Sequence, residues 1–275
     1  MLRANAITNR SLALKPSRFP GLHLSETDVH LWQANLDNHT AEIFESFLSE
    51  DELARANRFH FTNDRKHFVV ARGILRNLLA AYLGVNCTAL QFCYGAQGKP
   101  FVLQDDEQQI NFNVSHSHGR AVFVFSRGRE VGVDIEFIKE DFEADEIAQQ
   151  FFSRNEMASL RIVNAETKNR AFFDCWTRKE AYIKARGEGL SMPLDEFDVS
   201  LIPGDPAALV NNYRDEREVS RWSMQAITAP EGYVGALVVE GHDWQLKSFC
   251  FGISNGAKSA SAHASAPNRA HMSLR

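Results

Sequence analysis

The sequence repeats one order of segments, and this repeat restricts the fold more than any other feature. Residues 47–54 (FLSEDELA) resemble residues 151–158 (FFSRNEMA), and in each copy a serine stands three positions before a glutamate. That spacing is typical of a capping box, in which the two side chains bond the free backbone amides at the start of a helix. We therefore expect one helix to begin just after Ser49 and another just after Ser153.

The segments around these two helix starts also correspond. Alternation of apolar and polar residues predicts strands, and apolar residues at helical spacing predict longer helices. The order expected in each copy is strand, long helix and closing strand: residues 29–36, 68–83 and 121–126, then residues 131–138, 172–186 and 235–239. The sequence thus predicts an α+β fold of two similar α/β halves, related as a pseudo-twofold pseudodimer.

The ends of the chain differ from its middle. The first acidic residue is Glu26, after a basic stretch, and residues 253–275 are rich in Ala, Ser and Asn. Such segments bury too little apolar surface to offset the entropy of ordering. We expect a flexible leader at 1–25, halves at 26–130 and 131–252, and a disordered tail at 253–275. An organelle-targeting role for the leader stays open.

Composition excludes several classes of protein. The formal net charge of −5 argues against a nucleic-acid-binding protein that depends on a broad cationic surface. No apolar run is long enough to span a bilayer, and no signal-peptide core is visible. The four cysteines are scattered without metal-type pairing. We expect a cytoplasmic protein with reduced thiols, without nucleic acid or membrane among its partners.

Two short stretches of the second half carry the chemistry. In Gly132-Val133-Asp134-Ile135-Glu136, strand alternation places both carboxylates on one face. In residues 176–184 (WTRKEAYIK), helical spacing places Glu180 and Lys184 on one stripe. Three carboxylates and a lysine suit a divalent cation and a phosphate chain. A solvated strand face and an ordinary surface ion pair are the alternatives.

The first half lacks this acidic set. Its strand carries Trp32 and Ala34 where the second strand carries Asp134 and Glu136. Only the second half can therefore supply metal-binding carboxylates. One active site per chain is expected.

The motifs resemble the signature of the surfactin-type (Sfp-type) 4′-phosphopantetheinyl transferases, G-[IV]-D-[IV]-E followed by W-x-x-K-E-[AS]-x-x-K. Gly98-Lys99-Pro100 and residues 112–117 (FNVSHS) resemble two further elements of that family, in the same order. The resemblance extends over roughly residues 29–251. It implies an enzyme with its active site in the cleft between the two halves. The reaction would move 4′-phosphopantetheine from coenzyme A to a serine hydroxyl of a carrier protein, converting apo to holo carrier and releasing adenosine 3′,5′-bisphosphate.

The resemblance also implies a role for individual residues. The metal ligands would be Asp134, Glu136 and Glu180. The catalytic residues would be Glu180, as general base, and Lys184, beside the pyrophosphate. Because metal coordination lowers the basicity of a carboxylate, mediation by a metal-bound water is the alternative to direct proton transfer to Glu180. The residues binding coenzyme A would be Arg55, Lys99, Pro100, Ser115, His116 and Lys184. Arg58, Arg72 and Arg76 are weaker candidates for the same phosphates. Trp176 is expected to pack the helix, and Lys179 to be a supporting cation near the site. For Lys99 an ordinary turn, and for His116 and His118 a metal site, are the alternatives.

Cofactor and partners follow from the same resemblance. It implies Mg²⁺, with Mn²⁺ open, coenzyme A as donor substrate, and an acyl or peptidyl carrier protein of a fatty-acid, polyketide or nonribosomal peptide synthase as acceptor. A monomer is expected. Residues 139–152 are a candidate docking segment, through Phe142, Phe151 or Phe152. The alternatives are a coenzyme A-binding regulator without turnover and a Mg²⁺-dependent phosphohydrolase acting on coenzyme A.

Overall fold

The computed structural model describes residues 22–104, 109–140 and 142–252. Most of the expected leader, the whole expected tail and Asp141 lie outside the described residues. Two compact units are present: residues 38–90 form one, and residues 24–37 together with residues 91–252 form the other. This division differs from the division by repeat at residue 130, which stays a prediction.

The unit of residues 38–90 is helical. Its elements are α1 (Ala41–Glu45), α2 (Glu50–Ala56), α3 (Thr62–Leu83) and a 3₁₀ turn at Cys87–Ala89. α3 packs against α1 so closely that a Cβ at Gly73 would lie 2.5 Å from a ring carbon of Phe44. The helix begins at Thr62 rather than at the predicted residue 68, because its polar first turns show no apolar period.

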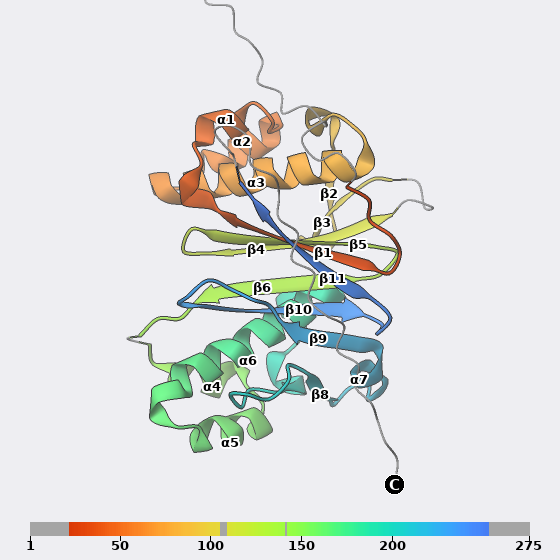
Figure 1. Cartoon of the computed structure of the whole chain (residues 1–275). Coiled ribbons are helices and arrows are strands. Elements are labelled where there is room, and N and C mark those ends of the chain that lie inside the picture. The colour runs from red at the N-terminus through yellow and green to blue at the C-terminus, as the bar shows by residue number, and fades with distance from the viewer. Residues whose placement is uncertain (1–21, 105–108, 141, 253–275) are drawn as a thin grey trace, which may run out of the picture. The chain divides into compact units, whose positions relative to one another are not determined.

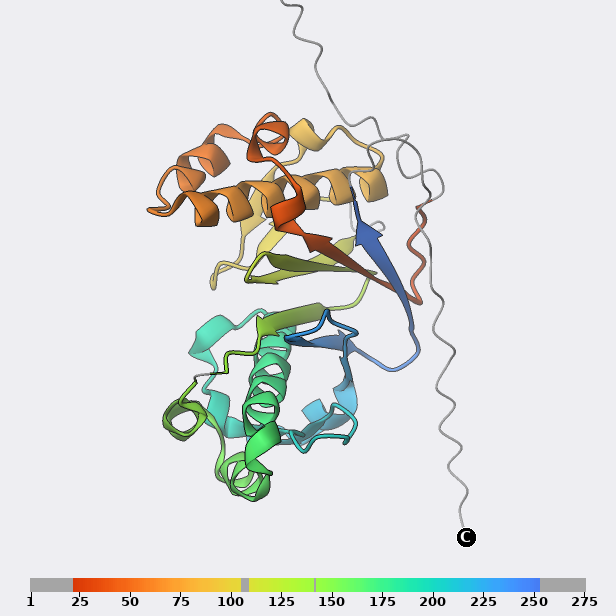
Figure 2. The ribbon, with the colours of Figure 1, turned by 60° about the vertical axis from the view of Figure 1, so that its left-hand side comes forward.

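The second unit contains two larger sheets (Figure 1). The four-stranded sheet has the order β11 (Gln245–Phe251), β1 (Asp28–Asn35), β5 (Arg120–Arg127) and β4 (Ile110–Ser117). The three-stranded sheet has the order β6 (Val131–Phe137), β10 (Tyr233–Glu240) and β9 (Trp222–Ala226). Figure 2 shows the chain leaving the three-stranded sheet after β10 and continuing as β11 beside β1, with which β11 pairs in parallel. Both predicted closing strands are confirmed as β5 and β10.

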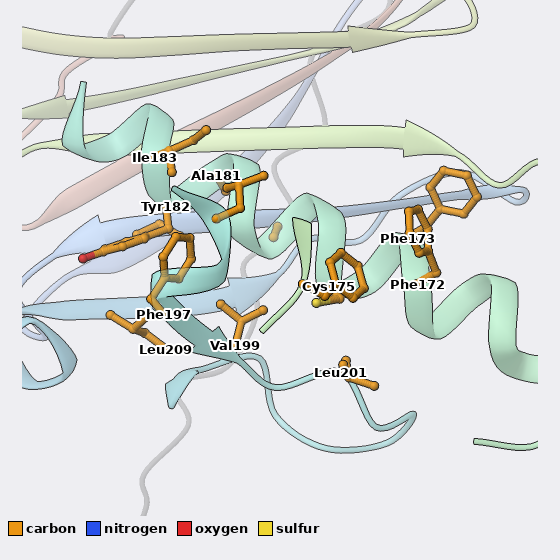
Figure 3. Packing of buried hydrophobic residues seen from close by; sticks show 14 of the residues in the cluster. Phe172, Phe173, Cys175, Ala181, Tyr182, Ile183, Phe197, Val199, Leu201 and Leu209 are labelled. Carbon is orange, nitrogen blue, oxygen red and sulfur yellow. The ribbon is translucent and has the colours of Figure 1, made fainter. Parts of the chain in front are cut away.

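Shorter elements complete this unit. They are β2 (Phe92–Tyr94) with β3 (Pro100–Val102), β7 (Phe197–Val199) with β8 (Leu209–Asn212), and the helices α4 (Ala144–Phe151), α5 (Arg154–Ile162), α6 (Ala165–Arg186) and α7 (Arg217–Arg221). α6 packs on β6 and β10. Aromatic and aliphatic side chains fill the space beneath it, with the ring of Tyr182 4.9 Å from that of Phe197 (Figure 3).

The two halves share the predicted order of elements. Capping boxes are present at Ser49 with Glu52 and at Ser153 with Glu156. α3 and α6 are each 22 residues long, and each ends at a glycine with positive φ, Gly84 or Gly187. The chain is therefore an α+β protein of two similar halves, as predicted.

The strand register confirms that the two halves carry different residues at the corresponding strand position. Trp32 of β1 is opposite Phe123 of β5, and Asp134 of β6 is opposite Ala236 at the corresponding place in β10. Trp32 is buried and stacks on Phe249 with ring centroids 4.7 Å apart. An apolar contact thus occupies the position that carries a carboxylate in the second half.

Side chains of β4 hold it against β6, although no backbone ladder joins these strands. The Val133 amide donates to Asn113 Oδ1 (3.0 Å), and the Phe137 amide donates to Ser117 Oγ (3.2 Å). Residues two apart on a strand face the same side, so Asn113, Ser115 and Ser117 all point toward β6. β4 of the first half and β6 of the second half thus lie against each other.

Gly132 sets the distance between β6 and α6. A Cβ at this position would lie 2.1 Å from the Ala181 carbonyl oxygen and 2.4 Å from the Ala185 nitrogen. These are backbone atoms of a long helix and cannot move aside singly. The glycine that opens the acidic motif is therefore required by packing.

We predict that Gly132→Ala destabilises the protein by about 1–3 kcal/mol, because the added methyl overpacks the strand against the helix backbone. Chemical unfolding measures the change. Gly95→Ala is the matched control, since a Cβ there would meet only the Lys99 carbonyl oxygen at 3.7 Å. Equal stability of the two variants would contradict this account of Gly132.

Candidate active site

The predicted site residues meet where β4, β6 and α6 come together. Asp134 lies on β6 and is 2% exposed. Its Oδ1 accepts hydrogen bonds from Ser115 Oγ on β4 (2.7 Å) and from Lys184 Nζ on α6 (2.6 Å). Lys184 also donates to Ser115 Oγ at 3.2 Å. Side chains of both halves therefore meet at one buried carboxylate, which pairs with a half-buried lysine.

Glu136 has a partner that the sequence analysis missed. Ser117 Oγ donates to Glu136 Oε2 at 2.8 Å. The signal was present in the alternation of β4, because Ser117 is two residues beyond Ser115 and must share its face. Each serine of the FNVSHS motif thus holds one carboxylate of β6.

Two carboxylates keep oxygen atoms available for a ligand. Asp134 Oδ2 is buried without a hydrogen-bond partner. Within the described part of the chain, Glu180 makes no hydrogen bond. A buried carboxylate oxygen without a partner is costly. A hard divalent cation, which prefers carboxylate oxygens, would satisfy both residues.

The pKa values also indicate that this group of three carboxylates has too little positive charge around it. Burial and the neighbouring charge of Asp134 raise the pKa of Glu136. Burial raises the pKa of Glu180; Lys184 counters this, whereas Asp134 and Glu136 add to it. Burial by itself would lower the pKa of Lys184, but the three carboxylates outweigh it and raise that pKa. The residues present therefore fit a bound cation.

As they stand, the carboxylates do not enclose an ion. Among the described residues, no group of three His, Cys, Asp or Glu side chains is arranged to hold a metal. The Lys184 ammonium lies on Asp134 instead. The predicted ligand set of Asp134, Glu136 and Glu180 stays a prediction.

Lys99 and Pro100 lie beside a neighbouring cavity. Its volume is about 300 Å³, and Asn111, Glu130 and Arg186 are among its lining residues. Lys99 Nζ bonds Glu130 Oε2 (2.8 Å) and the Ala185 carbonyl at the end of α6 (3.1 Å). The ammonium is thus already engaged at the helix terminus, and its predicted phosphate contact stays a prediction.

Comparison with known proteins agrees with this geometry. Residues 130–238 match the model of the 4′-phosphopantetheinyl transferase superfamily, and residues 31–128 match that of the 4′-phosphopantetheinyl transferase N-terminal region. The 4′-phosphopantetheinyl transferase HetI of Nostoc sp. is 38% identical over 232 residues, which cover 83% of this chain and 94% of that protein. The 4′-phosphopantetheinyl transferase Sfp of Bacillus subtilis is 31% identical, covering 60% of this chain and 72% of that protein.

The chain belongs to the 4′-phosphopantetheinyl transferase superfamily. The predicted family and class of enzyme are confirmed. A mammalian relative, the L-aminoadipate-semialdehyde dehydrogenase-phosphopantetheinyl transferase of Mus musculus, is 28% identical, covering 71% of this chain and 68% of that protein. In the described part of the transferase, no helix has the length and apolarity needed to cross a membrane.

The remaining candidates for coenzyme A phosphates are of two kinds. His116 is exposed on β4, while Arg55 and Arg58 are exposed residues of the unit 38–90, where the Arg55 guanidinium lies 5.4 Å from the Phe68 ring centroid. Their roles stay predictions. Arg76 is different: it is 1% exposed and is bonded to Glu52. Arg76 is therefore a structural residue, and the prediction of a phosphate contact is wrong for it.

Arg72 pairs with the same glutamate at 2.5 Å. Its side chain is 10% exposed, so a phosphate contact would require breaking this pair.

Two residues of the helical motif do not face the site. Trp176 stacks on Phe172 with ring centroids 6.1 Å apart, which confirms its predicted packing role. Lys179 is 0% exposed and pairs with Glu156 at 2.8 Å. The expectation of a supporting cation near the site is wrong for Lys179, because a helix turns by about 100° per residue and points its side chain away from that of Glu180.

The three rings of the candidate docking segment pack against neighbouring rings. Phe152 stacks on Phe172 (5.1 Å), and Phe142 contacts the same ring (4.9 Å). Phe151 lies edge-on to Trp176. Phe152 is a buried core residue, whereas Phe142 and Phe151 are partly exposed and pack against that core. A carrier contact through this segment stays a prediction.

We predict that Glu136→Gln stabilises the metal-free transferase at pH 7. A carboxyl group whose pKa is raised on folding favours the folded state while protonated and loses that advantage as pH rises through the raised pKa. The amide keeps the Ser117 contact without the charge. We expect a rise of a few degrees in Tm at pH 7, vanishing below about pH 4.3, the ordinary pKa of glutamate.

Thermal unfolding with EDTA at both pH values measures this difference. Glu140→Gln is the control, because Glu140 is exposed. A Glu136→Gln variant less stable than wild type at pH 7 would show that the carboxylate is satisfied in the folded state.

Proposed function

We propose that this transferase moves the 4′-phosphopantetheine group from coenzyme A to a serine of an acyl or peptidyl carrier protein at the junction of β4, β6 and α6. The observation that carries the proposal is the buried Asp134, bonded to Lys184 and Ser115 and left with one unpartnered oxygen. The serine oxygen bonds the β-phosphorus, and the bond from that phosphorus to the bridging oxygen breaks. Adenosine 3′,5′-bisphosphate leaves.

Asp134, Glu136 and Glu180 would hold Mg²⁺ or Mn²⁺. When bound, this cation would neutralise charge on the pyrophosphate, as metals do in phosphoryl transfer. The donor set consists of oxygens, which suits both ions.

Glu180 is proposed as the general base that accepts the proton of the serine. In the metal-free protein its pKa is raised, chiefly by burial, which brings it closer to neutral pH, where a base is most effective. A bound cation would lower that pKa. It also makes no hydrogen bond within the described part of the chain, so its oxygens are available.

Lys184 is proposed to offset charge on the departing phosphate. Its raised pKa keeps the ammonium protonated. In the structure the ammonium lies on Asp134, so it must turn from that carboxylate toward the pyrophosphate when coenzyme A binds. Fixed positive charge in a partly buried site is effective because water does not screen it fully.

Arg55, Lys99, Pro100, Ser115 and His116 are proposed to bind the nucleotide end of coenzyme A. Among these residues, Ser115 is buried and bonds Asp134 and Lys184. We further propose that the enzyme acts as a monomer in the cytoplasm on carriers of fatty-acid, polyketide or nonribosomal peptide synthases.

We predict that an apo carrier protein gains the mass of one phosphopantetheine when incubated with this protein, coenzyme A and Mg²⁺. Asp134→Ala and Glu180→Gln should abolish the gain, because each removes a carboxylate of the site. Intact-mass spectrometry measures it. Asp243→Ala, at an exposed carboxylate, is the control. Coenzyme A binding without transfer to any carrier type would favour the regulator, and cleavage without carrier loading would favour the hydrolase.

We predict opposite effects of Lys184→Met on turnover and on metal binding. Loss of the charge should lower kcat by about 100- to 1000-fold. The affinity for Mn²⁺ without coenzyme A should rise, because the ammonium no longer competes for Asp134. Lys168→Met is the control, since Lys168 is on the same helix but pairs with Asp145 near the surface. Weaker Mn²⁺ binding by Lys184→Met would rule out this competition.

A further inference from the structure

The lysine next to Glu180 in the helical motif forms a buried lock. Lys179 Nζ pairs with Glu156 Oε2 (2.8 Å) and donates to the carbonyl oxygens of Leu194 (2.6 Å) and Phe197 (2.7 Å). An ammonium has three donors, and these three contacts use them all. Lys179 therefore has no donor left for a phosphate.

Its partner, Glu156, joins two further parts of the unit. It closes the capping box of α5 by accepting from the Ser153 amide (2.9 Å), and it accepts from the Val199 amide in β7 (2.8 Å). Together with Lys179, it ties the start of α5, the middle of α6 and residues 194–199 to one point. We name this group of Glu156, Lys179 and their carbonyl and amide partners the α6 lock.

The first half contains the same arrangement in its own unit. Glu52 closes the capping box of α2 by accepting from the Ser49 amide (2.9 Å), and it pairs with Arg76 of α3 (2.7 Å). Arg76 donates to the carbonyl oxygens of Cys87 (2.7 Å) and Leu90 (3.1 Å), just beyond its helix. The device thus occurs twice in one chain, with arginine in place of lysine.

A buried ion pair is a weak source of net stability, because desolvation offsets the attraction. The ion pair has a more direct effect on the orientation of α6. On α6, Lys179 and Glu180 are consecutive, so fixing the first in the core fixes the direction of the second. Lys184 is one turn beyond Glu180 on the same helix, so the rotation of α6 about its axis also sets the direction of Lys184.

We propose that Lys179 is a positioning residue: the α6 lock sets the rotation of α6 that presents Glu180 and Lys184 to Asp134. This inference rests on the proposed function, because Glu180 and Lys184 are its proposed catalytic residues. It assigns Lys179 no contact with substrate.

The test compares two variants with wild type in the full chain. Lys179→Met removes the ammonium and leaves Glu156 charged. The double variant Lys179→Met/Glu156→Gln removes both charges, so it leaves no unpaired ion in the core and is designed to fold if the single variant does not. Leu209→Ala is the control: it truncates a buried side chain of the same core without touching a polar atom of the lock.

The measurements are kcat and the KM for coenzyme A in carrier loading, below each variant's Tm, and Mn²⁺ affinity by titration calorimetry. A displaced catalytic group should lower kcat by about 100-fold while the KM for coenzyme A changes by less than about threefold. Mn²⁺ affinity should fall by about tenfold, because Glu180 no longer faces Asp134. Leu209→Ala should lower Tm and keep kcat.

Two results would overturn the proposal. One is a folded variant with kcat and Mn²⁺ affinity near wild type, which would make the lock purely structural. The other is a KM for coenzyme A raised about tenfold or more with kcat kept, which would place Lys179 on the phosphates. If wild type loads no carrier, the proposed function fails, while the Mn²⁺ titration still tests the lock.

Discussion

The Lys184–Asp134–Ser115 contact is the interaction on which the rest of the site depends. It joins α6, β6 and β4 around a carboxylate that is almost fully buried. Such a charge is tolerated only when it is paired and hydrogen-bonded. β4 therefore has to lie against β6, and α6 has to pass close enough for its lysine to reach. Gly132 permits that approach, because no Cβ fits between the strand and the helix.

The two halves show which parts of a duplicated unit can diverge. Both keep the capping box, the buried cation that pairs with its glutamate, and the glycine that ends the long helix. These contacts form within each half and are needed wherever that half is to fold. The residues on the strand face are not needed for these contacts and can therefore differ between the halves. Trp32 on β1 stacks on Phe249, whereas Asp134 at the corresponding position of β6 belongs to the site. The two halves thus share their packing contacts, whereas only the second carries the acidic residues of the site.

Much of the site could be predicted from local spacing. Strand alternation placed Asp134 with Glu136, and helical spacing placed Glu180 with Lys184, because both patterns depend only on backbone geometry. Ser117 was missed although the same alternation with Ser115 implied it. Lys179 and Arg76 were misjudged, because the burial of a charged residue depends on partners distant in sequence. The polar first turns of α3 and α6 carried no apolar period and left those starts unpredicted.

By itself the sequence determined the duplicated α+β order, the starts of α2 and α5, the glycine ends of the long helices, the acidic set and the family. These features follow from short-range rules: capping, glycine termination, periodicity and motif order. Only the tertiary structure decided which polar groups meet. It showed that Ser115 and Ser117 hold the carboxylates of β6, that Lys184 lies on Asp134, and that Lys179 is locked in the core. Each depends on the packing distance between elements, which no local pattern encodes.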